Sequence, residues 1–236
     1  MAEMQENRFI PAHADAFAHP LPNFAKRLAG KDPVTIVAIG SSSTAGEGKK
    51  FPPYPDHLQA NLRIKYKDHR VTVVNQGKSG EEAPEELARM KRDVVEQQPA
   101  LVIWQVGTNA VWQLGHNLDD VAAAITAGLT LLANQPMDVV LMDLQYVPAV
   151  LTEDKIAATR RVLAMITESA AARPGVNVFH RFAMMQKWHE IEKISFDTMV
   201  DLDDVQRLHQ SDYSTQRVAF ELSEAIAAAA ARAHAT

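Results

Sequence analysis

The segment VTIVAIGSSSTAG, residues 34–46, decides the fold. Its first half is a short apolar run rich in β-branched residues, which is the pattern of a strand buried on both faces, as in a parallel sheet. Its second half changes to hydroxyl residues and glycine. A loop of this kind at the carboxyl end of a strand lies where open α/β sheets bind ligands. It suits two chemistries, a serine nucleophile beside its own oxyanion donors or a cradle for phosphate.

The strand pattern recurs further along the chain, and helical patterns separate the strands. Alternating strands and helices indicate parallel βαβ units, whose right-handed crossovers place helices on both faces of one sheet. We therefore predict an α/β fold, a three-layer α/β/α sandwich around a five-stranded parallel sheet. The other predicted strands are residues 71–75, 100–106, 138–143 and 176–179, and the main predicted helices are 81–98, 118–133, 153–172, 182–191 and 213–233.

Length and composition fit one domain. The 236 residues suffice for one substantial core, and no change in composition divides them. We predict a domain over residues 31–236 after a loose lead-in, 1–30, which three prolines interrupt. Leu58, Leu62 and Ile64 are expected to form one face of a helix after the serine loop.

Charge and residue content exclude several classes of function. The net charge is −5 with both signs scattered, so we expect no nucleic-acid partner. The chain has no cysteine, which excludes disulfides and thiolate chemistry. We expect no metal, because no pair of histidines has convincing ligand spacing with a carboxylate. The N-terminus is polar and no apolar run reaches the roughly 18–20 residues of a membrane span. We therefore expect a soluble cytoplasmic protein.

Three predicted strands end in small polar residues that can converge. They are followed by Ser42, Gly80 and Asn109, and parallel strands place such ends at one edge of the sheet. A hydroxyl, glycine N–H groups and an amide side chain are what acyl transfer needs, since the hydroxyl attacks and the donors hold the oxyanion. His209, just before the last predicted helix, is the candidate base.

These residues resemble a known family. The blocks Gly40-Ser41-Ser42-Ser43-Thr44, Gly80, Gly107-Thr108-Asn109 and Leu208-His209 are similar in order and spacing to those of the SGNH (GDSL-like) hydrolases, and look closest to a bacterial subgroup with GSSST. The resemblance implies a flavodoxin-like SGNH fold and ester hydrolysis without a cofactor. It also implies that Ser42 is the nucleophile, that Ser42, Gly80 and Asn109 form the oxyanion hole, and that His209 is the base.

The chain departs from the family pattern at three positions. Ser41 replaces the aspartate before the nucleophile, and Ala110 replaces the acidic residue after the third-block asparagine. The family also places an aspartate three residues before its histidine, where this chain has Gln206. We expect a short insertion to have moved the acid, so that Asp204 or Asp203 reaches His209. The alternatives are a Ser–His dyad oriented by Gln206 or a backbone carbonyl, or a protein with little activity.

Two further groups of residues allow predictions. Gln145 and Tyr146 follow the fourth predicted strand, so we expect them to bind substrate at the same sheet edge. The acidic pairs Glu81/Glu82 and Glu85/Glu86 are expected to form a solvated helix face.

The sequence thus favours a carboxylic ester hydrolase acting on a small-molecule, short-acyl or O-acetyl ester through an acyl-enzyme on Ser42. An acyltransferase uses the same chemistry with an alcohol in place of water. A flavodoxin-like FMN binder is the second reading, with residues 39–46 wrapped around a phosphate, although Pro52, Pro53 and Pro55 delay the next helix. A non-catalytic binding protein of the same fold is the third.

Overall fold

The computed structural model describes residues 16–46, 50–113 and 115–233, and all statements below concern these residues. Their strands form one five-stranded parallel sheet in the order β2-β1-β3-β4-β5, as the sequence predicts. The interior strands are mostly apolar and are buried on both faces, with polar side chains at Thr35, Gln105 and Asp138 near their ends. The strands are β1 (Val34–Gly40), β2 (Val71–Gly77), β3 (Leu101–Gln105), β4 (Asp138–Met142) and β5 (Val176–Phe179).

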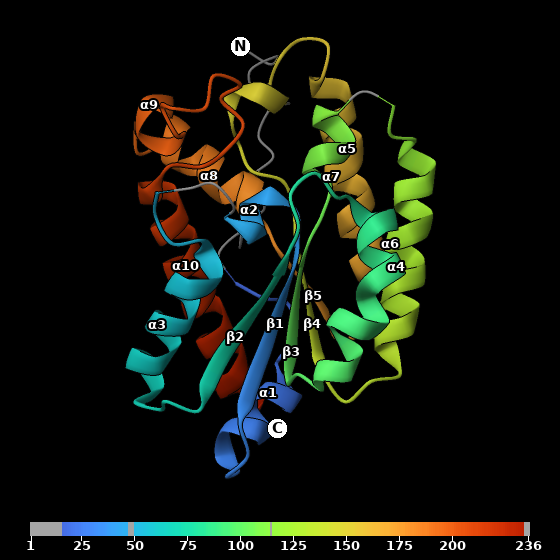
Figure 1. Ribbon diagram of the computed structural model, residues 1–236, viewed down its shortest axis with the longest axis vertical. Coiled ribbons are helices and arrows are strands. Elements are labelled where there is room, and N and C mark those ends of the chain that lie inside the picture. Colours follow the sequence, from blue (N-terminus) through green and yellow to red (C-terminus); the bar gives the residue numbers. More distant parts are fainter. Residues whose placement is uncertain (1–15, 47–49, 114, 234–236) are drawn as a thin grey trace.

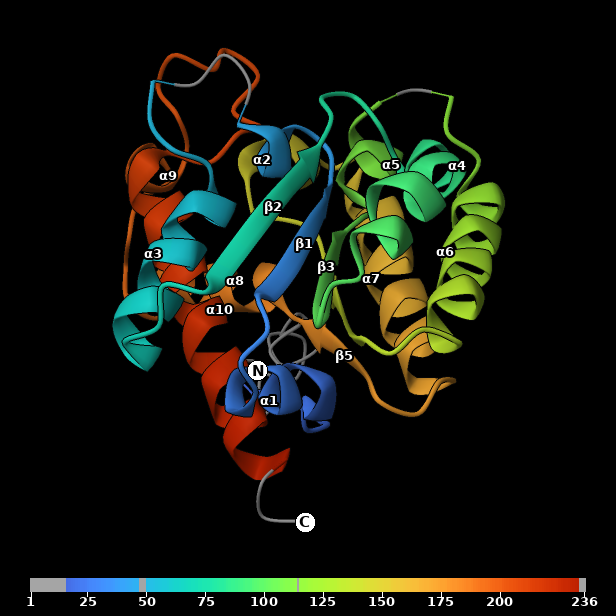
Figure 2. The same cartoon turned by 60° about the horizontal axis from the view of Figure 1, so that its bottom comes forward.

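Helices cover both faces of this sheet (Figure 1). On one side lie α3, α8 and α10, and on the other lie α4, α6 and α7, an arrangement that is seen again from a second direction in Figure 2. The helices are α1 (Pro22–Ala29), α2 (Ser42–Ala45), α3 (Tyr54–Tyr66), α4 (Ala83–Asp93), α5 (Thr108–Trp112), α6 (Leu118–Ala133), α7 (Ile156–Ala171), α8 (Arg181–Glu190), α9 (Phe196–Met199) and α10 (Asp212–Ala233), with 3-10 turns at Val95–Gln97 and Pro148–Val150.

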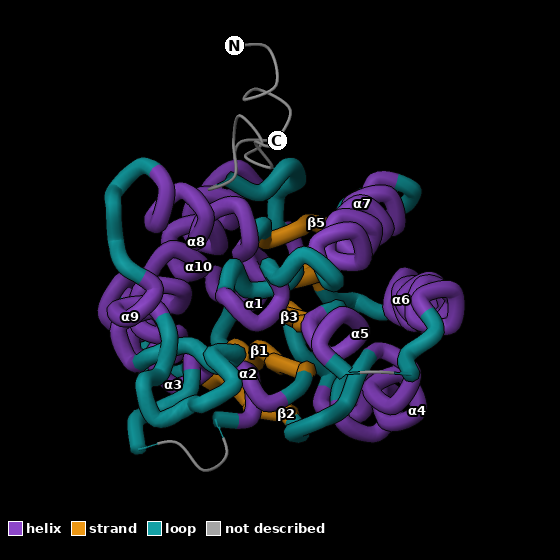
Figure 3. The backbone as a smooth tube through the Cα atoms, turned by 90° about the horizontal axis from the view of Figure 1, so that it is seen from above, coloured by secondary structure: helices purple, strands orange, loops and turns teal. Residues whose placement is uncertain are grey.

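The carboxyl ends of the strands meet at one edge, onto which Figure 3 looks. There α2 lies at the ends of β1 and β2, and α5 lies beside β3. Close packing requires glycine at this edge, because a Cβ atom on Gly77 would stand 2.2 Å from the backbone nitrogen of Ala45. The short helix α2 therefore sits directly on the end of β2. Among the described helices, none combines the length and hydropathy needed to cross a membrane.

The described part of the lead-in packs into the core. Phe17, Leu21 and Phe24 are buried, and α1 packs against α10 and the start of β4. Asp138 at the start of β4 holds the first turn of α1, since its carboxylate accepts the backbone N–H groups of Asn23 and Phe24 at 3.3 and 2.9 Å. Residues 16–30 are therefore tied to the sheet rather than loose.

One helix face differs from its prediction. Leu58 and Leu62 are buried in α3, but Ile64 is 76 % exposed. Since a helix turns by about 100° per residue, Ile64 stands roughly 200° around the axis from Leu62 and points away from the core. The expectation that it belonged to the buried face was wrong.

Replacing Asp138 tests the attachment of α1. We expect Asp138→Ala to lower the free energy of unfolding by about 1–3 kcal/mol, because it leaves buried backbone N–H groups of α1 without an acceptor. Chemical denaturation measures this change. Asp119→Ala is the control, since its exposed pair with Arg161 contributes about 0–1 kcal/mol. An equal loss in the two variants would contradict the account.

Candidate active site

The serine loop is held by a buried glutamine at the end of β3. The Oε1 atom of Gln105 accepts hydrogen bonds from the Ser41 backbone N–H and hydroxyl, both at 3.1 Å, and from the Thr44 hydroxyl at 3.2 Å. Ser42 is the first residue of α2, so its backbone N–H has no partner within the helix. A Cβ atom on Gly40 would collide with both Thr44 and Gln105, which explains the glycine before the serines.

The histidine stands on a loop whose two ends are tied together. Val200 and Gln210 form an antiparallel bridge, and the Asp201 N–H donates to the His209 carbonyl at 3.0 Å. Inside this closure Arg207 has φ +52°, a left-handed conformation that reverses the chain. The loop therefore folds back on itself and presents the His209 ring, whose side chain is 24 % exposed.

Asp204 is the acid that reaches this ring. Its Oδ2 atom lies 2.8 Å from His209 Nδ1 and also accepts the backbone N–H groups of Leu208 and His209 at 2.9 and 2.7 Å. Burial alone would raise the pKa of the Asp204 carboxyl, but hydrogen bonds from the backbone and ring of His209, and from the backbone of Leu208 and Gln206, hold that pKa below its ordinary value. The side chain is thus an ionised acceptor.

The other candidate acids lie elsewhere. Asp203, 76 % exposed at its side chain, forms an ion pair with Lys50 at 2.8 Å. Gln206 is exposed, and its backbone N–H donates to Asp204 Oδ1 at 3.1 Å. The five-residue separation between Asp204 and His209 is bridged by the turn through Arg207, which absorbs the longer loop.

Ser42, His209 and Asp204 form one continuous chain of hydrogen bonds. The Ser42 hydroxyl oxygen lies 3.0 Å from His209 Nε2. Because an ionised Asp204 can only accept, His209 Nδ1 carries a hydrogen, and in the neutral form of such a ring Nε2 accepts from the Ser42 hydroxyl. This is the relation of nucleophile, base and orienting acid in a catalytic triad. A small pocket of about 20 Å³ adjoins the serine and histidine, and Phe51, Pro53 and Thr215 are among the residues that line it.

The two other predicted donors lie on adjoining turns. Gly80 has φ +84°, and the side chain of Gln113 donates to its carbonyl at 3.3 Å. Asn109 is buried on α5, and its side-chain nitrogen donates to the Glu81 carbonyl at 2.8 Å. A carbonyl only accepts, so this contact fixes which amide atom is nitrogen and leaves its second hydrogen available.

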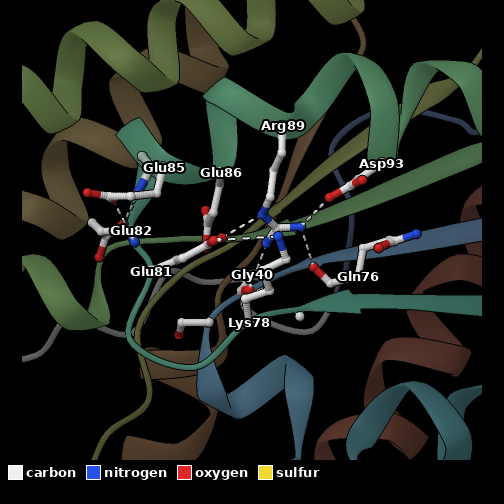
Figure 4. A network of polar contacts seen from close by, with 12 residues as sticks. Gly40, Gln76, Lys78, Glu81, Glu82, Glu85, Glu86, Arg89 and Asp93 are labelled. Atoms are coloured by element: carbon white, nitrogen blue, oxygen red, sulfur yellow. Dashed lines mark hydrogen bonds and ion pairs between the residues drawn. The ribbon is translucent and has the colours of Figure 1, made fainter.

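A network of carboxylates around Arg89 links α4 to the segment before it (Figure 4). Arg89 forms ion pairs with Glu81 and Asp93 at 2.5 and 3.0 Å and donates to the carbonyls of Gln76 and Gly40 at 2.8 and 3.4 Å. It therefore joins α4 to the ends of β1 and β2. Arginine is suited to this, since its planar group carries five donors in fixed directions.

The expectation of a solvated acidic helix face was wrong for half of its residues. Glu82 and Glu86 are buried, and Glu82 caps α4 in a capping box with Glu85. Glu86 accepts from the Trp104 indole N–H at 2.6 Å, while its Oε1 has no partner in the described structure. Burial and the charge of Glu82 raise the pKa of Glu86 well above its ordinary value, which favours the protonated form of this carboxyl.

The structure does not support Gln145 and Tyr146 as substrate-binding residues. Gln145 is 1 % exposed, and its amide is used inside the protein. Tyr146 is buried against the rings of Phe182 and Phe196, and its hydroxyl donates to Glu190 at 3.2 Å. Both residues follow β4 as expected, but α8 and α9 pack against Tyr146, and the partners of Gln145 are Ser43, Thr108 and Leu208.

Gln145 instead joins three segments of the site. Its Nε2 donates to the Leu208 carbonyl at 2.9 Å, and its Oε1 accepts from the Ser43 and Thr108 hydroxyls at 3.1 and 3.4 Å. Each partner is the direct neighbour of Ser42, Asn109 or His209. Sequence reasoning missed this role, and that of Gln105, although an uncharged polar residue at the end of an apolar strand was the available signal.

No group of three metal-ligating side chains is found in the described ranges. A larger cavity of about 450 Å³ lies between α7 and α8, lined by Asp143 and His180 among others and not by Ser42 or His209. The carboxyl edge of β1, β2 and β3 is therefore where the candidate catalytic groups are assembled.

The fold is the one found in hydrolases of the SGNH type. The chain can be superposed on an acetylxylan esterase from Geobacillus stearothermophilus, in a catalytic mutant of Axe2, with a TM-score of 0.71 and 18 % identity over 84 % of this chain and 95 % of that one. LAE5, an α/β hydrolase from the metagenome of Lake Arreo, superposes with a TM-score of 0.67 and 18 % identity, over 86 % of this chain and 98 % of LAE5. A putative lipolytic protein of the G-D-S-L family from Desulfitobacterium hafniense superposes with a TM-score of 0.62 and 17 % identity, over 81 % of this chain and 99 % of that one.

The model of the Non-GDSL lipase-like family matches residues 9–232. The chain therefore belongs to the Non-GDSL lipase-like family, which confirms the resemblance to GDSL-like proteins, while the GSSST subgroup stays a prediction. A search of curated proteins gave no match.

Glu86 makes stability depend on pH. Its pKa is raised in the folded state, so the unfolded chain loses this proton first as pH rises above about 4.3, and stability falls until the folded-state pKa is passed. Glutamine does not titrate, so we expect Glu86→Gln to raise the melting temperature at pH 8 and to change it little at pH 4. The expected gain in the free energy of unfolding at pH 8 is about 1.4 kcal/mol for each unit by which the folded-state pKa of Glu86 exceeds its unfolded-state pKa. Calorimetry of both proteins at both pH values measures this gain. If the stability of Glu86→Gln relative to wild type is lower at pH 8 than at pH 4, the raised pKa of Glu86 is contradicted.

Proposed function

We propose that the protein is a serine esterase that hydrolyses small carboxylic esters through an acyl-enzyme on Ser42. The hydrogen-bonded chain from Ser42 through His209 to Asp204 carries this proposal. Family membership supports it, as does the fold shared with esterases. The catalytic mutants of the Axe2 esterase replace an aspartate, a serine and a histidine, the same three residue types.

The first half of the reaction forms the acyl-enzyme. His209 Nε2 takes the Ser42 hydroxyl proton while the oxygen attacks the acyl carbon. Asp204 keeps the ring oriented through Nδ1 and stabilises the imidazolium that forms. When the tetrahedral intermediate collapses, the bond from carbon to the alcohol oxygen breaks and His209 returns the proton to that oxygen. The alcohol leaves, and the acyl group stays on Ser42.

The second half repeats this sequence with water. His209 takes a proton from water, the resulting oxygen attacks the acyl carbon, and collapse breaks the bond to Ser42, whose oxygen regains the proton from His209. In both halves the oxyanion accepts hydrogen bonds from the backbone N–H of Ser42 and of Gly80 and from the second hydrogen of the Asn109 amide. An alcohol that replaced the water would make the same acyl-enzyme a donor for acyl transfer.

A short acyl group fits this site best. The pocket beside Ser42 and His209 has a volume of about 20 Å³, against about 450 Å³ for the cavity between α7 and α8. Phe51 and Pro53 are among the residues that line it, and this small volume supports an acetyl group rather than a long acyl chain. No described observation favours FMN binding: the helix after the serine loop is a single turn, and α3 begins only at Tyr54.

A series of p-nitrophenyl esters tests the function and the acyl pocket together. We expect kcat/KM to be highest for acetate and to fall as the acyl chain lengthens. Ser42→Ala should lower kcat by about 10⁶-fold, since removing the nucleophile costs about that much in a serine protease. Equal rates for acetate and octanoate would contradict the short-acyl assignment, and full turnover by Ser42→Ala would contradict the esterase mechanism.

The two neighbouring aspartates provide a matched pair. We expect Asp204→Asn to lower kcat by about 10⁴-fold, because the amide cannot stabilise the imidazolium and favours the wrong tautomer. Asp203→Asn removes a similar charge one residue away, but its partner is Lys50 at the surface, so its kcat should stay within about 2-fold of wild type. Steady-state assays of both variants measure the difference. Comparable losses in the two variants would refute the role of Asp204.

A further inference from the structure

Glu82 joins two turns that carry candidate oxyanion donors. Its Oε1 accepts the backbone N–H groups of Ala83 and Gly107 at 3.0 and 2.8 Å, and its Oε2 accepts that of Ala110 at 2.8 Å. Gly107 and Ala110 flank Asn109 on either side, so this one carboxylate grips both ends of the turn from which the Asn109 side chain projects.

A second contact runs between the same turns in the opposite direction. The Asn109 side chain donates to the carbonyl of Glu81, the residue before Glu82 and next to Gly80. The Asn109 amide is thus fixed in orientation only while these two turns keep their relative position. A displacement of the order of 1 Å in a catalytic group can cost about 10²-fold in rate.

We propose that Glu82 is a positioning residue for the oxyanion hole, whose buried carboxylate locks the Gly107–Ala110 turn onto the Gly80–Glu82 turn and so aims the Asn109 amide. This inference rests on the proposed esterase function. Glu82 acts through Asn109 and Gly80 and does not itself contact the substrate.

Charge distinguishes Glu82 from its neighbour Glu86. Both are buried, and burial raises the pKa of each. Glu82 accepts three backbone N–H groups, which favour its ionised form, whereas Glu86 accepts only the Trp104 indole. Since two like charges so placed disfavour each other, the contacts favour the charge on Glu82 and the proton on Glu86.

The contact with Ala110 is made through the backbone, since Glu82 accepts the Ala110 N–H at 2.8 Å. Arg89 braces the opposite side, since it binds Glu81 and the carbonyls of Gln76 and Gly40 (Figure 4). Glu82 is thus held in a rigid frame.

The matched variants Glu82→Gln and Glu86→Gln test the proposal. In Glu82→Gln an amide NH₂ faces a backbone N–H of Gly107 or Ala110, so the grip on the turn is lost. We expect kcat on p-nitrophenyl acetate to fall about 10- to 100-fold with KM within about 3-fold, because the oxyanion forms only in the transition state. Glu86→Gln keeps its acceptor for Trp104 and should retain kcat within about 2-fold. Equal kcat values in the two variants overturn the proposal.

A double-mutant cycle separates positioning from general loss of structure. Asn109→Ala removes the donor that Glu82 aims, so adding Glu82→Gln to it should lower kcat by less than about 3-fold further. If the two losses multiply in the double variant, Glu82 does not act through Asn109. Assays are run at a temperature where circular dichroism shows every variant to be folded.

A readout without substrate keeps the outcome independent of the esterase assignment. We expect backbone amide hydrogen exchange at Gly107 and Ala110 to be at least about 10-fold faster in Glu82→Gln than in wild type and unchanged in Glu86→Gln. Unchanged exchange in Glu82→Gln overturns the positioning role whatever the activity. Absence of ester turnover in wild type, with faster exchange in Glu82→Gln, would refute the proposed function and leave the lock on the turn established.

Discussion

The loops that leave the carboxyl edge of the sheet carry backbone N–H and C=O groups that no neighbouring strand can satisfy, and the site depends on how these groups are paired. Buried polar groups without partners cost about 1–3 kcal/mol each. This chain supplies the partners from buried side chains at or next to the strand ends. Gln105 accepts hydrogen bonds from the serine loop, and Glu82 accepts them from the turn that carries Asn109. Gln145 contacts the residues next to Ser42, Asn109 and His209. The same hydrogen bonds therefore satisfy the backbone polar groups and align the candidate catalytic side chains.

In the loop that carries His209, Asp204 supplies the partners for the backbone N–H groups. Its carboxylate accepts the backbone N–H groups of Gln206, Leu208 and His209 as well as the His209 ring. A side chain that organises its own loop also sets the direction of the imidazole, which explains how the acid tolerates a five-residue separation from the histidine. The bridge between Val200 and Gln210 confines this loop, so the position of the ring is determined by local contacts.

Periodicity and the ends of the strands were sufficient to predict the sheet and its crossovers, since parallel βαβ units admit few arrangements. The contacts of His209 with Ser42 and with Asp204 were expected from the resemblance to SGNH hydrolases, with Asp203 as the alternative acid, and the catalytic roles of these residues stay a prediction. What patterns in one sequence could not show is which polar side chains turn inward. Gln145 was expected to face a substrate and Glu82 and Glu86 to face water, yet all three are buried, because their partners come from segments distant in the sequence.

The fold brings the hydroxyl of Ser42 to His209, whereas Ser41 and Ser43 contact Gln105 and Gln145. Covalent labelling with a fluorophosphonate, followed by mass spectrometry of the labelled peptide, tests this arrangement. We expect a single adduct on Ser42 in the folded protein, absent after denaturation and strongly slowed in His209→Ala. An adduct on Ser41 or Ser43, or no adduct on folded protein, would contradict it.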